Sequence, residues 1–317
     1  MYITNYDHKF NFTGQGSKLF GIVIVNLLLT IITLGIYYPW AKAALLQYLY
    51  KETQLSGAAF TFHGTGKEIF KGYIKAMLIF GAVYGIVILC THYQMPFLGL
   101  AILYLAFFIL IPFVIHGSLK YRLSRTSWRG IHFGYRGTLK VLSKKLYKNL
   151  FLTFITFGIY GAWLVINIRK YTISNIRYGN VELNYKGKGS KFLGIVVIGY
   201  LLSIFSFGIY SFWWYKDLYN YLITNITLHQ NGKEIPVKSS INGVGLLKLM
   251  LINFIIIVFS LGIAYPWAQV RTMKYLSSNI FIGKGFDPDS VTQTEKQYKD
   301  ATGEDLGDML DMDLSII

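Results

Sequence analysis

Polar side chains recur at fixed positions inside the most apolar stretches of this chain. They lie nine, five and two residues before a glycine, so they share one face of a helix. The residues concerned are Asn26, Thr30, Thr33, Asn149, Thr153, Thr156 and Asn253. Such a stripe could line a polar pathway for a small solute or receive a lipid headgroup. The alternative is interhelical hydrogen bonding, because Asn, Ser and Thr commonly join membrane helices.

The residue types that enzymes use for catalysis do not recur at fixed positions in this way. No carboxylate lies in the middle of an apolar stretch, although proton-coupled transport commonly uses one there. The six histidines lack the paired spacing of metal ligands, and Cys90 is the only cysteine. No G-x-S-x-G phrase occurs. The sequence therefore predicts neither an enzyme nor a bound cofactor or metal.

The polar stripes belong to a repeated phrase. Thr33-Leu34-Gly35-Ile36-Tyr37 is followed by Trp40, and similar phrases occupy 156–163, 206–213 and 260–267. A tyrosine stands eight residues after each tryptophan. A degenerate unit, with Phe113 in place of the tryptophan, fits between the first two copies.

Each unit closes on a short alternation of apolar residues and glycines, which indicates a strand and a turn. These closing phrases lie at 12–16, 62–66, 133–137, 185–189 and 241–245. Self-similarity at a fixed period is typical of repeat architectures. We therefore predict an N-terminal strand-like segment at 1–17, a membrane domain at 18–286 and an acidic, disordered tail at 287–317. The membrane domain would hold about five repeats, at 18–67, 68–137, 138–189, 190–245 and 246–286.

Composition supports a membrane location. Hydrophobic residues make up 53% of the chain and charged residues 15%, whereas soluble domains are about one-quarter charged. The apolar residues gather in six segments long enough to cross a hydrocarbon core, near 19–40, 73–91, 97–116, 146–166, 192–214 and 247–267. The predicted fold is an all-α polytopic membrane protein made of tandem transmembrane repeats with short β-strand connectors.

The phrase Asn-x-x-x-Thr-x-x-Thr-x-Gly-Ile-Tyr-x-x-Trp, with its trailing tyrosine and glycine-rich strand, resembles the YjgN-like family of bacterial inner-membrane proteins. The resemblance covers residues 1 to about 285. It implies a multi-pass protein of the bacterial cytoplasmic (inner) membrane. The family is a domain of unknown function, so the resemblance supplies no reaction.

The charge of the chain, +16, points to the membrane surface rather than to nucleic acid, because the basic residues flank apolar segments. The densest basic loop should be cytoplasmic and attract anionic lipids. Its residues include Arg122, Arg125, Arg129, Lys144 and Lys145. Each phrase also ends in a tryptophan where aromatic belts lie, which predicts interface anchors at Trp40, Trp163, Trp213 and Trp267.

Two topologies fit these observations. Six simple crossings would place equivalent closing phrases on opposite faces of the membrane. Alternatively, the Thr-x-Gly-Ile-Tyr phrase is a turn, the chain returns to its starting side, and all closing strands could pair into one sheet. Two functions are predicted: a transporter, channel or facilitator for a small solute or lipid, or a non-transporting envelope protein that binds lipid or a protein partner.

Overall fold

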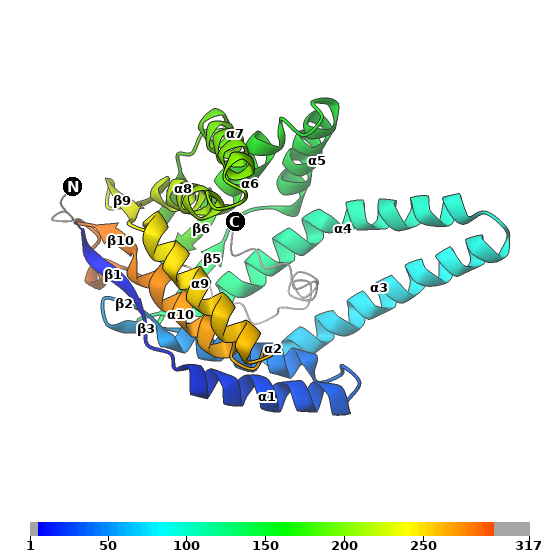
Figure 1. Ribbon diagram of the computed structural model, residues 1–317, viewed down its shortest axis with the longest axis horizontal. Coiled ribbons are helices and arrows are strands. Elements are labelled where there is room, and N and C mark those ends of the chain that lie inside the picture. The colour runs from blue at the N-terminus through cyan, green and yellow to red at the C-terminus, as the bar shows by residue number, and fades with distance from the viewer. Residues whose placement is uncertain (1–5, 295–317) are drawn as a thin grey trace.

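The computed structural model describes residues 6–294, in which pairs of helices alternate with pairs of strands (Figure 1). Each helix packs against the next one along the chain, and α10 packs against α1, so the helices form a closed ring. The pairs are α1 (Gly16–Ile32) with α2 (Tyr38–Glu52), α3 (Gly66–His92) with α4 (Pro96–Ser124), α5 (Leu139–Ile155) with α6 (Gly161–Ser174), α7 (Gly189–Phe205) with α8 (Ser211–Thr224), and α9 (Gly243–Phe259) with α10 (Tyr265–Ser278).

The strands form a closed antiparallel barrel at one end of the helices (Figure 1). Neighbours along the chain are neighbours in the barrel, and β1 pairs with β10 to close it, with Lys9 opposite Phe281. The strands are β1 (Tyr6–Phe12), β2 (Thr53–Leu55), β3 (Ala58–Phe62), β4 (Thr126–Trp128), β5 (Ile131–Tyr135), β6 (Ile176–Tyr178), β7 (Val181–Tyr185), β8 (Ile226–Gln230), β9 (Lys233–Ser239) and β10 (Ile280–Gly283).

The predicted all-α polytopic fold is therefore wrong. The closing phrases are not isolated connectors, because they lie at the ends of strands that belong to one barrel of ten strands. Among the described helices, only α3 and α4 are long and apolar enough to cross a membrane. The 17 residues of α1 span about 25 Å, which is less than the roughly 30 Å of a hydrocarbon core.

The repeated phrase reverses the chain, which is why four of the six apolar segments are not single spans. Leu34 and Gly35 have positive φ values of 49° and 91°, and α1 ends there. The amide of Gly35 donates to the carbonyl of Thr30 at 2.8 Å, and the hydroxyl of Thr33 accepts from the amide of Tyr37 at 3.0 Å. The turn thus satisfies the backbone groups left open where one helix ends and the next begins.

Large side chains fill the barrel. Trp128, Tyr178 and Ile235 lie in its buried core. The Trp128 indole donates to the carbonyl of Ala58 at 2.9 Å, and the Tyr178 hydroxyl donates to the carbonyl of Trp128 at 3.0 Å. The polar atoms of both rings are therefore satisfied inside an apolar core, as buried polar groups require.

The segment after β10 covers one end of the barrel. Phe286 and Val291 enter the barrel core, on either side of the 3-10 turn Pro288–Ser290. The buried Gln230 amide donates to the carbonyl of Asp287 at 2.7 Å and accepts from its amide nitrogen at 2.9 Å. The predicted disordered tail therefore begins too early, because residues 287–294 are ordered against the barrel. The remainder of that tail, 295–317, lies outside the described residues.

Tryptophan–glycine contacts join one helix pair to the next. Gly66 is the first residue of α3, and a Cβ atom there would overlap the Trp40 indole. The same contact joins Trp163 to Gly189, Trp213 to Gly243 and Trp267 to Gly16. At the junction of α4 with α5 both partners are missing, since Phe113 replaces the tryptophan and Leu139 replaces the glycine.

The trailing tyrosine joins the two helices of one pair. The Tyr48 hydroxyl accepts from the amide of Gln15 at 2.8 Å and donates to its carbonyl at 3.0 Å, so it caps the start of α1. Equivalent bonds link Tyr171 to Thr138, Tyr221 to Lys188 and Tyr275 to Asn242. At the fifth closing phrase the capped residue is Asn242, so the phrase occupies 239–243 and begins two residues earlier than the 241–245 of the sequence alignment.

The tryptophan–glycine contact predicts opposite effects for two alanine substitutions on α7. Gly189→Ala should destabilise the protein by about 1–3 kcal/mol, because the methyl group overpacks against Trp163. Gly194→Ala meets no atom within 4 Å and should leave stability unchanged or raise it by up to about 1 kcal/mol. Thermal unfolding in detergent would measure both, and equal midpoints would contradict the packing role.

Candidate functional site

The threonines of the polar stripes are used within their own helices. The hydroxyls of Thr30 and Thr153 donate to the carbonyls of Asn26 and Asn149, at 2.7 and 2.8 Å. Thr33 and Thr156 donate in the same way to the carbonyls four residues earlier. Thr156 also accepts from the amide of Tyr160 at 2.9 Å, as Thr33 does from Tyr37. The hydroxyls of Thr33 and Thr156 thus hold the turn between paired helices.

Two of the three stripe asparagines join neighbouring helices, and the third lines a cavity. The side-chain oxygen Oδ1 of Asn149 accepts from the side-chain amide of Asn167 at 2.7 Å, which joins α5 to α6. The Asn253 amide donates to the Thr272 hydroxyl at 2.9 Å, which joins α9 to α10. Asn26 and Thr30 instead line a cavity beside α1 and α2. The structure therefore does not bring the three stripes together around one route.

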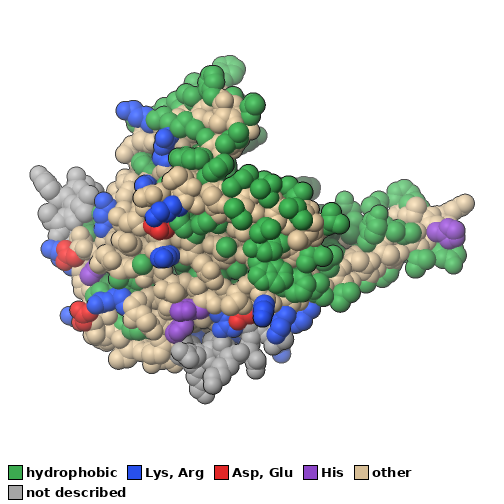
Figure 2. Space-filling view, turned by 90° about the horizontal axis from the view of Figure 1, so that it is seen from below, with side chains coloured by type: hydrophobic (Ala, Val, Ile, Leu, Met, Phe, Trp, Pro, Cys, Tyr) green, Lys and Arg blue, Asp and Glu red, His purple; other side chains and the backbone are tan. Residues whose placement is uncertain are grey.

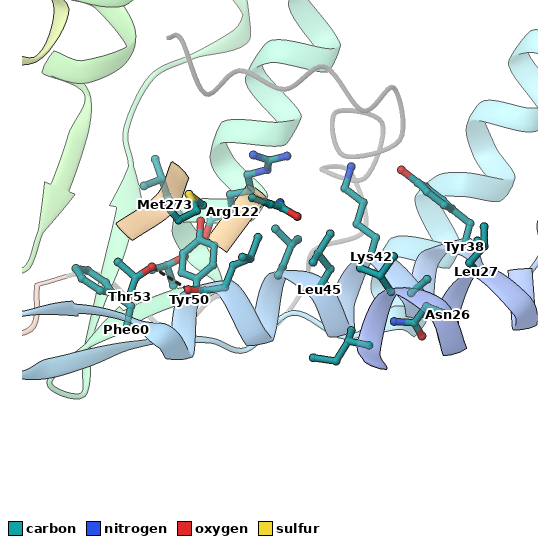
Figure 3. Close-up of a pocket in the computed structure, with 18 of the residues that line it drawn as sticks. Asn26, Leu27, Tyr38, Lys42, Leu45, Tyr50, Thr53, Phe60, Arg122 and Met273 are labelled. Atoms are coloured by element: carbon teal, nitrogen blue, oxygen red, sulfur yellow. Dashed lines mark hydrogen bonds between the residues drawn. The ribbon is translucent and has the colours of Figure 1, made fainter. Parts of the chain in front are cut away.

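This cavity has a volume of about 770 Å³ (Figure 3). Its walls come from α1, α2, the end of α4 and α10, and its floor is the mouth of the barrel at Phe10, Phe60 and Phe133. The volume lies within the range of about 300–1,000 Å³ found for small-molecule sites. Most of the lining is apolar, as in such sites, with a few polar groups among it.

Two cations lie among these apolar walls. Lys42 on α2 is only 7% exposed, and its ammonium lies 5.9 Å from the centre of the Tyr38 ring. Arg122 near the end of α4 also lines the cavity. Figure 3 shows both charged groups on the same side of α2. No aspartate or glutamate occurs among the described residues that line the cavity.

Sequence reasoning missed Lys42, although the repeat carries a signal for it. Two residues after each motif tryptophan the chain has Lys42, Val165, Tyr215 or Gln269. Only the first copy places a charge there. A cation at one position of an otherwise uncharged set marks a departure from the repeat, and this comparison could have found it.

The predicted basic loop does not form a single patch. Arg122 lines the cavity, whereas Arg125 forms an ion pair with Glu68 at 2.9 Å, largely shielded from solvent. Arg129 pairs with Asp289 at 2.6 Å, beside the segment that covers the barrel. Lys144 and Lys145 are exposed on α5. One of the five residues therefore lines the cavity, two form ion pairs and two are exposed on α5.

The tips of the short helix pairs are apolar and exposed. The left-handed residue of each turn is Leu34, Phe157, Phe207 or Leu261, with 92%, 98%, 98% and 92% of its surface exposed. Hydrophobic side chains continue from these tips along the outer helix surface, while lysines and arginines gather toward the barrel (Figure 2). Exposed apolar surface of this extent marks an interaction with a membrane or a protein.

The predicted anchor tryptophans lie below these tips. One face of each indole covers a glycine of the next helix pair, and Trp267 keeps 38% of its surface exposed. Trp40 and Trp267 also contact Phe70 and Phe20, with ring centres 5.1 and 5.2 Å apart. Each tryptophan therefore makes a packing contact between helix pairs.

Within residues 6–294, no three His, Cys, Asp or Glu side chains are placed to hold a metal ion.

Residues 7–185 and 214–309 match a family described as bacterial protein of unknown function (DUF898). The chain belongs to this family. Three relatives carry the name inner membrane protein YjgN, which supports the predicted inner-membrane location. No solved structure matches the chain.

The YjgN relatives match only part of this DUF898 protein. The Salmonella typhimurium protein is 37% identical over 136 residues, which is 43% of this chain and 33% of the relative. The Escherichia coli O157:H7 and K12 proteins are each 35% identical over 133 residues, which is 42% of this chain and 32% of the relative. The match therefore spans about a third of these relatives' length.

The Asn149–Asn167 bond predicts energetic coupling between α5 and α6. Replacing either residue with leucine leaves the other amide without its partner, so the double variant should lose less stability than the two single losses added together. We expect a coupling free energy of about 0.5–1.5 kcal/mol from unfolding in detergent. Asn26→Leu, at the matching position on α1, should cost less because Asn26 lines the cavity. Strictly additive losses would contradict this role.

Proposed function

We propose that this protein is embedded in the inner membrane from one side, where it binds membrane lipid and does not transport a solute. The helix pair α3–α4 crosses the bilayer and returns, which makes the protein multi-pass. The four shorter pairs enter one leaflet and turn back inside it. The barrel stays in water on the side from which the helices enter.

The chemistry of the five tips carries this proposal. All five place a residue in the left-handed conformation, with φ between 49° and 59°. In the four short pairs that residue is leucine or phenylalanine, whereas in the long pair it is Gln94, beside His92 and Tyr93. A short pair that ends within hydrocarbon requires an apolar tip. A pair about 40 Å long reaches water beyond the far headgroups and requires a polar one.

The turn geometry also suits a tip inside hydrocarbon, where unpaired backbone groups are costly. The amides of Leu34, Gly35 and Ile36 donate to the carbonyls of Ile31, Thr30 and Thr33. The amide of Tyr37 is met by the Thr33 hydroxyl, and Pro39 has no amide hydrogen. The turn therefore needs no water to satisfy its donors.

The charge distribution supports a cytoplasmic barrel. Lysines and arginines lie toward the barrel half of the surface, while the arm formed by α3 and α4 is largely apolar (Figure 2). Positively charged segments remain on the cytoplasmic side of inner-membrane proteins. The hydrogen bonds of the stripe residues favour lipid binding over transport, because they use the groups that a polar pathway would need.

Cysteine labelling tests this topology. In a Cys90→Ser background, single cysteines would replace Gln94 at the long tip, Phe157 at a short tip and Lys233 on the barrel. A membrane-impermeant maleimide added outside the inner membrane should label only the first. The third should react once the cytoplasm is opened, and the second only after detergent is added. Labelling of Phe157→Cys from outside, or of Gln94→Cys and Lys233→Cys from one side, would contradict the proposal.

A charge at a short tip should destabilise the protein only in a bilayer. Phe157→Glu places a carboxylate in hydrocarbon, which costs roughly 2–3 kcal/mol. Asn231→Glu is a matched control, because Asn231 has the same backbone conformation, φ 51° against 50°, and is exposed on the barrel. Thermal unfolding would be compared in liposomes and in detergent. Equal midpoints for the two variants in liposomes would show that the Phe157 tip lies in water.

A further inference from the structure

We propose that the outer face of α5 binds the headgroup of one anionic phospholipid, whose acyl chains lie along the aromatic surface shared by α4 and α5. This inference rests on the proposed membrane insertion and names the lipid class and its site. Three observations carry it: a stripe of lysines on α5, the distance of these lysines from the tip of their helix pair, and the aromatic surface beside them.

Three lysines lie on one exposed face of α5. Lys140, Lys144 and Lys148 are spaced four residues apart, so they share one side of the helix, and all three are exposed. Within residues 6–294, no carboxylate forms an ion pair with any of them. Like charges at this spacing destabilise a helix, and an anionic headgroup between them would relieve the repulsion. The matching helices of the other short pairs each carry a single lysine, at Lys18, Lys191 and Lys248.

The position of the lysines along α5 matches the headgroup layer of the membrane. At 1.5 Å per residue, Lys148, Lys144 and Lys140 lie about 14, 20 and 26 Å from the tip residue Phe157 along the helix axis. One leaflet of a hydrocarbon core is about 15 Å thick, and the headgroup layer adds about 5–8 Å. A helix pair whose tip reaches the middle of the bilayer therefore holds Lys148 and Lys144 at the level of the lipid phosphates.

Aromatic side chains line the way from these lysines toward the tip. The Tyr147 ring of α5 stacks on Phe108 of α4, with ring centres 4.8 Å apart. Phe151 lies one turn nearer the tip and is 64% exposed. This surface runs from the lysines away from the barrel and into the leaflet. Acyl chains along it would therefore lie in hydrocarbon while the headgroup stays on the barrel side.

The junction of α4 with α5 is built differently from the other junctions, and this difference fixes the aromatic surface. Phe113 and Leu139 replace the tryptophan and the glycine that close the other four. Pro112 has no amide hydrogen, so the helix supplies no donor to the carbonyl of Phe108. The Tyr147 hydroxyl lies 3.4 Å from that oxygen and holds the ring against α4. A surface already held in place loses less conformational entropy when a lipid binds.

The binding test uses the full-length protein, freed of lipid in detergent and titrated with fluorescent phosphatidylglycerol. Replacing all three α5 lysines with glutamine should weaken binding at least tenfold. The matched control removes the same charge from the other short pairs and should change binding less than twofold. Its substitutions, also at exposed positions, are Lys18→Gln, Lys191→Gln and Lys248→Gln. Phosphatidylcholine should bind more weakly, and millimolar inorganic phosphate should not compete.

A second pair of variants tests the apolar half of the site. Phe151→Gln should weaken binding at least threefold without altering the charge of α5. Leu201→Gln changes the same position on α7, which is also exposed, and should leave binding unchanged. Thermal unfolding in detergent checks that each variant is folded. Equal binding by these two variants would place the acyl chains away from α5.

Three further results would overturn the assignment. Equal binding by the α5 lysine variant and its control would make the attraction a general effect of charge. Full competition by inorganic phosphate would make this a site for a free anion. Binding that appears only after removal of residues 295–317 would make the acidic C-terminal segment the occupant. Because the titration is done in detergent, it does not depend on insertion depth, which the cysteine labelling measures separately.

Discussion

The pairing of β1 with β10 is the contact on which both closed layers depend. These strands come from opposite ends of the described chain, and no loop or helix pair joins them directly. Without their hydrogen bonds the barrel would have two open edges, which in other proteins invite aggregation. The same closure brings α10 against α1, so that Trp267 can cover Gly16. The helix ring and the barrel therefore both close where the two ends of the described chain meet.

Much of the local structure could be predicted from the repeated phrase. Its glycine, its preceding hydroxyl residue and the helix that follows indicated a reversing turn as one of two topologies, and the structure has this turn at residues 33–37. Hydropathy alone predicted spans, because Leu34 and its equivalents are as apolar as the helices on either side. A left-handed leucine looks like any other leucine in a sequence, so an apolar turn is easily taken for the middle of a helix.

One of the two topologies predicts that the closing strands pair in a sheet, but neither predicts the strands between them, the closed barrel or the cavity. Several strands have only three residues, as in Thr53–Leu55 and Ile176–Tyr178, so alternation has no length over which to appear. Their partners lie across whole helix pairs, and such pairing is set by tertiary contacts. Lys42 departs from the repeat in one copy, which marks its position in the sequence, but its burial in the cavity is visible only in the structure. Packing residues such as Tyr48 recur in each repeat and can be recognised in the sequence, whereas a lysine at the position of Lys42 occurs in one repeat only.

Building the ring from one continuous chain removes its rotational symmetry. Five separate copies of one short subunit would carry the same side chain at every position and could not lengthen one arm alone. Here a single arm, α3–α4, exceeds the others, and the lysine-bearing cavity adjoins it through Tyr38 and Tyr73. The long arm and the cavity thus mark one side of the helix ring. Any neighbour that recognises the long arm is placed at a fixed angle to the cavity.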